Sequence, residues 1–116
     1  MTVDFATADS AHPGWRSPVR RALPEGIRDV SAEAGDTLGP AAGVAGIELE
    51  GGQAAGLLAR LTELDLDALP AVGAVAEVRM LLERPAAHQF RLWFGRELAE
   101  YVVEVVLDTA EGLRWE

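Results

Sequence analysis

Apolar and polar residues alternate along residues 44–50, and a period of two is typical of a strand with one buried face. Glu48 and Glu50 occupy polar positions, so we expect both side chains to point outward. The apolar face carries Ala45, Ile47 and Leu49. Gly51 and Gly52 follow at once and end the predicted strand.

Residues 75–85 and 90–94 predict two further strands, joined by a turn at residues 86–89. The apolar side of the first strand consists of Val78, Met80 and Leu82. In the second strand, one face carries Phe90, Leu92 and Phe94. Its other face carries Arg91 and Trp93, because side chains alternate across a strand.

Two other segments follow a helical period. In residues 53–64 the apolar positions recur at helical spacing, at Ala54, Leu57, Leu58 and Leu61. Residues 98–111 are rich in valine, but a strand pattern there would mix valines and acids on one face. A helical pattern separates an apolar stripe (Leu98, Tyr101, Val102, Val105 and Thr109) from an acidic stripe (Glu97, Glu100, Glu104, Asp108 and Glu111). We therefore predict a helix that ends at Gly112.

Proline and glycine mark the connections within residues 44–116, which we expect to form one domain. Residues 65–73 contain Pro70 and Gly73 and are predicted to be a loop. Residues 112–116 are expected to add a final edge strand. The order is then the ferredoxin-like βαββαβ arrangement of the α+β class, with both helices on one face of an antiparallel sheet and the other face open.

Residues 1–43 contain repeated prolines and glycines and are expected to form an extended arm ahead of the domain. Arg16, Arg20 and Arg21 cluster beside Trp15 in this arm. An aromatic anchor next to arginines is typical of protein interfaces, so these four residues are predicted to contact a partner. The alternative is that Trp15 folds back over the chain's own sheet while the arginines neutralise an acidic surface.

Trp93, with Arg79 and Arg91, is expected on the open face of the sheet. The same two alternatives apply to it. Trp93 either contacts a partner, as the four arm residues would, or is partly covered by the N-terminal arm.

Chain length, net charge and cysteine content exclude some classes of function. A chain of 116 residues suits a single core, and its ten cations, all arginine, are outnumbered by 19 acidic residues to give a net charge of −9. Such an acidic domain is a poor candidate for nucleic-acid binding, which depends on neutralising phosphates. The chain has no cysteine. Neither a bilayer-spanning apolar run of about 20 residues nor a signal pattern is apparent, so we expect a cytoplasmic protein that does not enter a membrane.

Candidate chemistry is sparse. His12 and His88 lie in the arm and in a turn, where a lone histidine is usually solvated. The glycines of residues 35–46 lack the lysine and the spacing of a phosphate-binding loop. Asp65 and Asp67 alternate with leucines and are more typical of a solvated loop than of a catalytic pair. We therefore expect this chain to contain no catalytic, cofactor-binding or metal-binding residues.

Several of these patterns together resemble a known family. A paired-leucine helix leads to a Leu-Asp-Leu step, a Pro-Val-Gly-like loop, an apolar strand, and a strand that runs into an arginine-led helix start. The matching positions are Leu57, Leu58, Leu64, Asp65, Leu66, Pro70, Gly73, Phe90, Arg96, Ala99 and Tyr101. In these positions the chain resembles the sarcosine oxidase gamma-subunit family, which is related to the folate-binding domain of aminomethyltransferases. Residues 16–19 are similar to a Ser-Pro-Leu stretch near that family's N-terminus.

The resemblance implies a small non-catalytic subunit of a heteromeric flavoprotein sarcosine oxidase or N-methyl amine demethylase. It also implies partners, the large and small subunits of that complex, which would hold FAD, FMN, NAD and tetrahydrofolate. The residues leave a second possibility open, a free-standing ferredoxin-like module that binds a small ligand or dimerises through its open sheet face.

Overall fold

The computed structural model of the protein describes residues 16–34 and 43–115. Within these ranges the chain forms five strands, two α-helices and three short 3-10 turns. In chain order they are β1 (Ile27–Asp29), η1 (Ser31–Glu33), β2 (Val44–Glu50), α2 (Ala54–Ala59), η2 (Leu66–Ala68), β3 (Ala71–Val75), β4 (Val78–Ala86), β5 (Gln89–Gly95), η3 (Arg96–Leu98) and α3 (Ala99–Gly112). Neither helix combines the length and the apolar character that crossing a membrane requires, as far as the described ranges extend.

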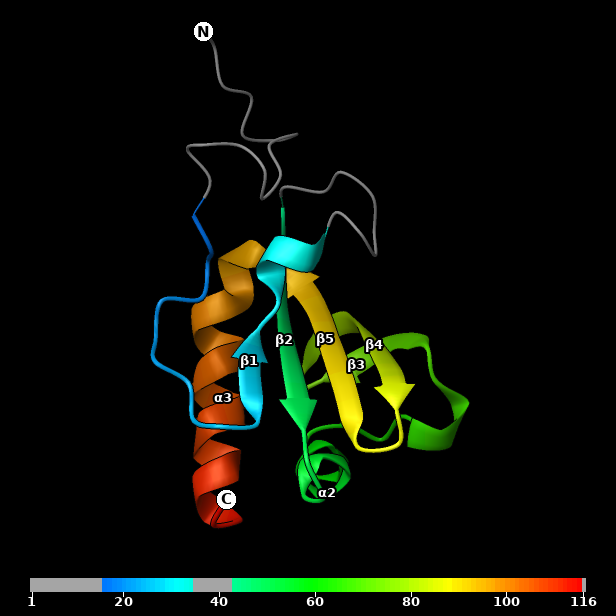
Figure 1. Ribbon diagram of the computed structural model, residues 1–116. Helices are drawn as coiled ribbons and strands as arrows, with labels where there is room; N and C mark the ends of the chain where they lie inside the picture. The colour runs from blue at the N-terminus through cyan, green and yellow to red at the C-terminus, as the bar shows by residue number, and fades with distance from the viewer. Residues whose placement is uncertain (1–15, 35–42, 116) are drawn as a thin grey trace, which may run out of the picture.

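A single antiparallel sheet contains all five strands, in the order β1-β2-β5-β4-β3 (Figure 1). β2 and β5 pair along their whole length, from Val44 opposite Gly95 to Glu50 opposite Gln89. Both helices pack on one face of this sheet, and we call it the helix-covered face. Its core includes Ile47, Phe94 and Met80, all of which were predicted to face inward. The α+β class follows, as the sequence predicted.

The order of the elements differs from the predicted ferredoxin-like βαββαβ arrangement. Three strands follow α2 in succession, and residues 113–115 do not form the expected edge strand. The chain instead turns at Arg114, whose φ is 55°. Trp115 then packs against the core, and its Nε1 donates to the carbonyl oxygen of Glu25 at 2.9 Å. The partly buried indole therefore lies beside the loop before β1 instead of extending the sheet.

The connection after α2 also differs from the prediction. α2 ends at Ala59 instead of extending to residue 64, because Leu61 and Thr62 run beside β3. The amide of Ala76 donates to the carbonyl oxygen of Leu61 at 2.7 Å, and the Thr62 hydroxyl donates to that of Ala74 at 2.7 Å. The last three residues of the expected loop, residues 71–73, therefore belong to the edge strand β3.

The buried stripe of α3 is rotated relative to the prediction. It consists of Ala99, Val102, Val103, Val106 and Ala110. Tyr101, expected on this stripe, is 43% exposed, and its hydroxyl donates to the carbonyl oxygen of Ala76. The predicted acidic stripe is exposed along its whole length. The helix therefore presents its valines to the sheet and its carboxylates to solvent.

Candidate partner-binding site

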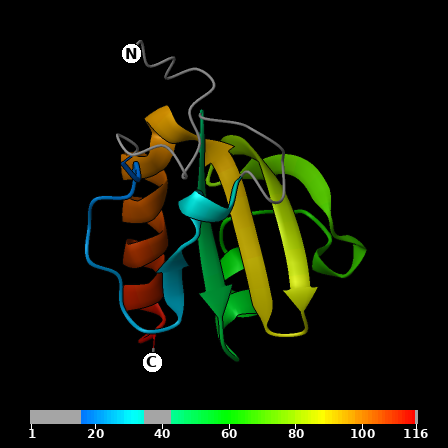
Figure 2. The same ribbon diagram turned by 45° about the horizontal axis from the view of Figure 1, so that its top comes forward.

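The N-terminal segment, residues 16–34, lies on two different surfaces of the domain. Its first part, residues 16–25, has no regular secondary structure and runs beside α3 in both views of the molecule (Figures 1 and 2). Its second part, residues 27–34, forms β1 and η1 and covers part of the sheet face opposite the helices. This part was predicted to belong to an extended arm. The pairing of Ile27 with Leu49 instead makes it the edge of the sheet.

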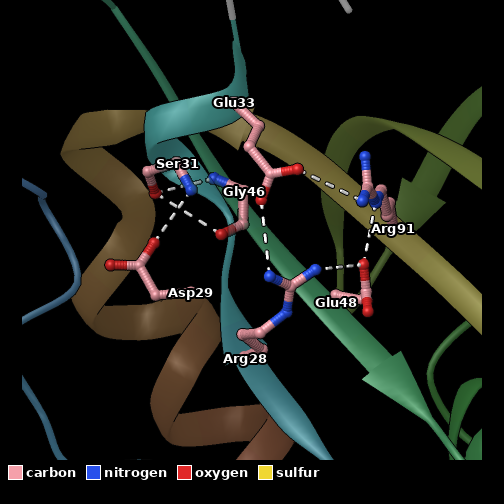
Figure 3. A network of polar contacts seen from close by, with 7 residues as sticks. All are labelled: Arg28, Asp29, Ser31, Glu33, Gly46, Glu48 and Arg91. Atoms are coloured by element: carbon pink, nitrogen blue, oxygen red, sulfur yellow. Dashed lines mark hydrogen bonds and ion pairs between the residues drawn. The ribbon is translucent and has the colours of Figure 1, made fainter. Parts of the chain in front are cut away.

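Hydrogen bonds attach the second part of the segment to β2 (Figure 3). The amide of Val30 donates to the carbonyl oxygen of Gly46 at 3.0 Å. The Ser31 hydroxyl is buried, accepts from the amide of Gly46 at 3.0 Å and donates to its carbonyl oxygen at 3.4 Å. One Asp29 oxygen accepts from the amide of Ser31 at 2.9 Å, and the other accepts from the Ser17 hydroxyl. Asp29 therefore connects the two parts of the segment.

Four charged side chains form a network beside these bonds, and we call it the polar clamp (Figure 3). Glu48 accepts from Arg28 Nη2 at 3.0 Å and from Arg91 Nε at 2.9 Å. Glu33 lies 3.6 Å from Arg28 Nη1 and 3.3 Å from Arg91 Nη2. Glu48, predicted to point outward into solvent, is only 3% exposed. Its two arginine partners offset the energetic cost of burying the charged carboxylate. The clamp also joins β1 and η1 to the centre of the sheet.

The environment of Glu48 acts on its pKa in two opposing ways. Burial alone raises the pKa of Glu48, because it disfavours the charged form. Hydrogen bonds from Gln89, Arg91 and Arg28 outweigh burial and leave the pKa of Glu48 below its usual value. The hydrogen bond to Glu48 also raises the pKa of Arg28. Both members of the pair are therefore held in their charged forms.

Trp93, which was predicted to contact a partner, is buried within this chain. The side chain is 2% exposed and packs in a small cluster with Val30 and Ala34. Its Nε1 donates to a carboxylate oxygen of Glu83. The indole lies directly over Gly46, where an added Cβ would be only 2.3 Å from a ring carbon. The alternative in which the N-terminal segment covers Trp93 is the one that the structure shows.

The first part of the segment and the start of α3 enclose a hollow of about 420 Å³, which we call the N-terminal groove. Its apolar lining comes from Pro18 and Val19 on one side and from Ala99 and Val103 on the other. Its cationic lining consists of Arg20, Arg21 and Arg96. Glu97 and Glu100, both exposed, complete it on the helix side. Charged groups of both signs thus surround an apolar floor.

The structure brings together some of the predicted partner-contact residues. Arg20 and Arg21 are exposed and line the groove. Arg16 is also exposed, and its carbonyl oxygen accepts from Arg96 Nη2 at 3.4 Å. Trp15 lies outside the described residues. Sequence analysis did not connect Arg96 with the arm arginines, since 75 positions separate it from Arg21 and no motif spans them.

The described residues contain no group of three or more His, Asp or Glu side chains arranged to hold a metal ion. Every buried side-chain nitrogen or oxygen among them has a hydrogen-bond partner. Asp65 accepts from the amide of Asp67 at 2.9 Å, and Asp67 pairs with Arg84 at 3.0 Å. These two carboxylates therefore stabilise the loop around η2. Chemically, the groove offers arginines that can bind a carboxylate next to an apolar surface.

Comparisons with known proteins found similarity at the level of fold. No protein-family model matches the chain, and no curated protein matches it. The fold is similar to that of one chain in a multi-subunit oxidase. That structure is the heterotetrameric sarcosine oxidase from Corynebacterium sp. U-96 in complex with pyrrole 2-carboxylate, with a TM-score of 0.57 and 19% sequence identity. The match covers 71% of this chain and 48% of the oxidase chain, so the shared fold is about half of the larger chain.

Proposed function

We propose that this chain is a non-catalytic subunit of a heteromeric flavoprotein oxidase that acts on an N-methyl amine such as sarcosine. The observation that carries the proposal is the similarity of its fold to a chain of heterotetrameric sarcosine oxidase, over 71% of this chain. The resemblance of its helix, loop and strand motifs to the gamma-subunit family points the same way. In this proposal, partner subunits hold the flavins and folate, and this chain supports assembly.

The two surfaces of the N-terminal segment suggest where the partner binds. Residues 27–34 are attached to the sheet by the polar clamp and by the bonds to Gly46. Arg16, Arg20 and Arg21, by contrast, point from residues 16–25 into exposed positions. Arginine is frequent among the residues that dominate interface energetics. We therefore assign the partner contact to these three arginines and the groove beside them.

The alternative, a free-standing module that dimerises through open sheet faces, has less support. Residues 30–34 cover Trp93, and the polar clamp occupies the neighbouring part of the same face. A second copy would have to pack against charges that already have partners. Among the described residues, Val72 is the one large apolar side chain exposed on the strands of that face, at 53%, so a second copy would find little apolar surface there.

The proposal is tested by purifying a tagged form of the chain from its own cells. We expect the chain to elute in a complex that has a flavin absorption spectrum and oxidises sarcosine or a related N-methyl amine. The same chain expressed alone should be colourless and inactive. A stoichiometric flavin in the isolated chain would contradict the proposal. Elution solely as a free monomer or homodimer, without a flavin-containing partner, would contradict it as well.

A further inference from the structure

We propose that the N-terminal groove receives a short acidic segment of a partner protein, in which an Asp or Glu side chain lies next to an aliphatic one. This inference rests on the proposed function for the identity of the partner, a subunit of the same oxidase. It adds the chemistry of the contact, namely one carboxylate on Arg20 and Arg21 and one apolar side chain on the floor of the groove.

The size and floor of the groove fit one or two side chains of a peptide. A hollow of about 420 Å³ lies in the range of small ligand sites, roughly 300–1,000 Å³. Its floor is formed by Val19, which is half-buried, and by Ala99 and Val103, which are each 2% exposed. An aliphatic side chain that enters would leave water itself and cover the remaining exposed apolar atoms of Pro18 and Val19, whereas Ala99 and Val103 are already buried and add little area. It would thereby gain hydrophobic stabilisation.

The charges of the groove favour a carboxylate. Arg28, Arg84 and Arg91 each form ion pairs within the chain. Arg20 and Arg21 form none with any residue that the structure describes. Both guanidinium groups are exposed beside the groove, and each can donate paired hydrogen bonds to a carboxylate. They are also among only ten cations in a chain of net charge −9, so their position beside one groove is distinctive.

The same charges disfavour a polyanion such as nucleic acid or an anionic membrane. Glu97 and Glu100 line the helix side of the groove, and Glu104 is exposed one turn further along α3. A ligand with many negative charges would meet these carboxylates as soon as it extended beyond the arginines. A single carboxylate on a peptide avoids them. The groove therefore matches a short protein segment better than a phosphate backbone.

The wall that carries the arginines is held in place before any partner binds. At its start, the Val19 amide donates to the Ser17 hydroxyl at 3.1 Å, and that hydroxyl donates to Asp29. At its end, the Glu25 carbonyl oxygen accepts from Trp115 Nε1 at 2.9 Å. A binding surface that is already ordered loses less conformational entropy when it binds. Residues 16–25 therefore have the properties of a preformed groove wall.

The first test reverses the two arginine charges in the assembled complex. Arg20→Glu/Arg21→Glu should weaken binding to the partner subunit at least tenfold, equivalent to about 1.4 kcal/mol. The control, Arg60→Glu/Arg79→Glu, makes the same charge change at exposed positions outside the groove and should alter the dissociation constant less than twofold. Both variants should keep the unfolding midpoint of the original chain. Equal binding by the groove variant and the original chain would overturn the inference and leave the proposed function standing.

The second test does not depend on the oxidase partner. Capped five-residue peptides with a Glu beside a Leu are titrated into the labelled chain, with Gln-for-Glu peptides as controls. The Glu peptides should shift the amide NMR signals of residues 19–21 and 96–103, and the shifts should disappear in Arg20→Glu/Arg21→Glu. Shifts that do not depend on the carboxylate would overturn the inference, as would changes produced by raising the chain's own concentration alone. If the original chain forms no flavin-containing complex, the proposed function fails, and this titration alone decides the chemistry of the groove.

Discussion

The two faces of the sheet are buried in different ways. On the helix-covered face, apolar residues from all five strands meet α2 and α3 in one continuous core. On the opposite face, the buried side chains among the described residues are the small cluster around Trp93, Ser31 beside Gly46, and Glu48 in the polar clamp. Among the described residues, η1 and the two residues beside it, Val30 and Ala34, cover Trp93 on this face. The core depends on many shared contacts, whereas the opposite face depends on a few specific ones.

Because of this difference, substitutions on the two faces should affect different properties: the stability of the whole domain, or the attachment of residues 27–34 to the sheet. Loss of one contact on the helix-covered face should weaken the whole domain, because the core is continuous. Loss of one contact on the opposite face should mainly loosen residues 27–34, because few other residues depend on it. Substitutions on the two faces can therefore distinguish global unfolding from local release.

The largest effect is expected from Phe94→Ala on the helix-covered face. Phe94 is 3% exposed and packs in the main core, so its removal leaves a cavity. We expect the free energy of unfolding to fall by about 3–5 kcal/mol. Chemical denaturation measures this change. A loss well below 1 kcal/mol would show that the core collapses around the site or that the ring is not part of it.

A smaller effect is expected from Gly46→Ala on the opposite face. The added methyl group would lie 2.3 Å from the Trp93 ring, so the indole and the residues that cover it must move. We expect a loss of about 2–3 kcal/mol. In a Trp93→Ala background the same change should be nearly neutral, because the clashing ring is gone. A double-mutant cycle measures this coupling, and additive effects would contradict the predicted contact.

Glu48→Gln should cost about 1–2 kcal/mol near neutral pH, since it removes the charge that Arg28 and Arg91 share. The pKa of Glu48 is lower in the folded chain than in the unfolded chain. Its contribution is therefore present above the unfolded pKa of about 4.3 and lost as the pH falls through the lower folded value. The stability difference between Glu48→Gln and the original chain should shrink over that range. Denaturation midpoints measured at several acidic pH values test this, and a constant difference would contradict it.

The smallest effect is expected at Val72, and Val75 in the same strand provides a matched control. Val72 is 53% exposed on the face opposite the helices, whereas Val75 is 1% exposed in the core. Val72→Thr should change stability by less than about 0.5 kcal/mol. Val75→Thr places a hydroxyl in the core and should cost about 1–3 kcal/mol. Similar values for the two substitutions would mean that the two faces do not differ at this edge of the sheet.

The helix-covered face could be predicted from the sequence because its signal is local. The alternation of β2, β4 and β5 assigned the inward residues of each strand correctly. β3 was missed because Ala71–Val75 contains a glycine and no polar alternation. Its hairpin turn uses Ala76 and Glu77 at positive φ, without the usual Asn-Gly signal.

The opposite face could not be predicted in this way. β1 spans only three residues, too few to show a period. Glu48 is buried through partners that lie 20 and 43 positions away in the chain, at Arg28 and Arg91. The burial of Trp93 likewise depends on Val30 and Ala34, which lie in a segment that is rich in glycine and proline. The N-terminal groove joins residues that are just as distant, so only its arginine side could be predicted.

The burial of Trp93 also provides an optical signal. Its indole is 2% exposed beneath Val30 and Ala34, and its ring nitrogen donates to Glu83. Indole fluorescence moves to longer wavelengths in water, because solvent dipoles relax around the excited ring. With Trp15 and Trp115 replaced by phenylalanine, the remaining emission would come from Trp93 alone. Its wavelength would then report, in real time and without an added dye, whether residues 27–34 are attached to the sheet while a partner binds.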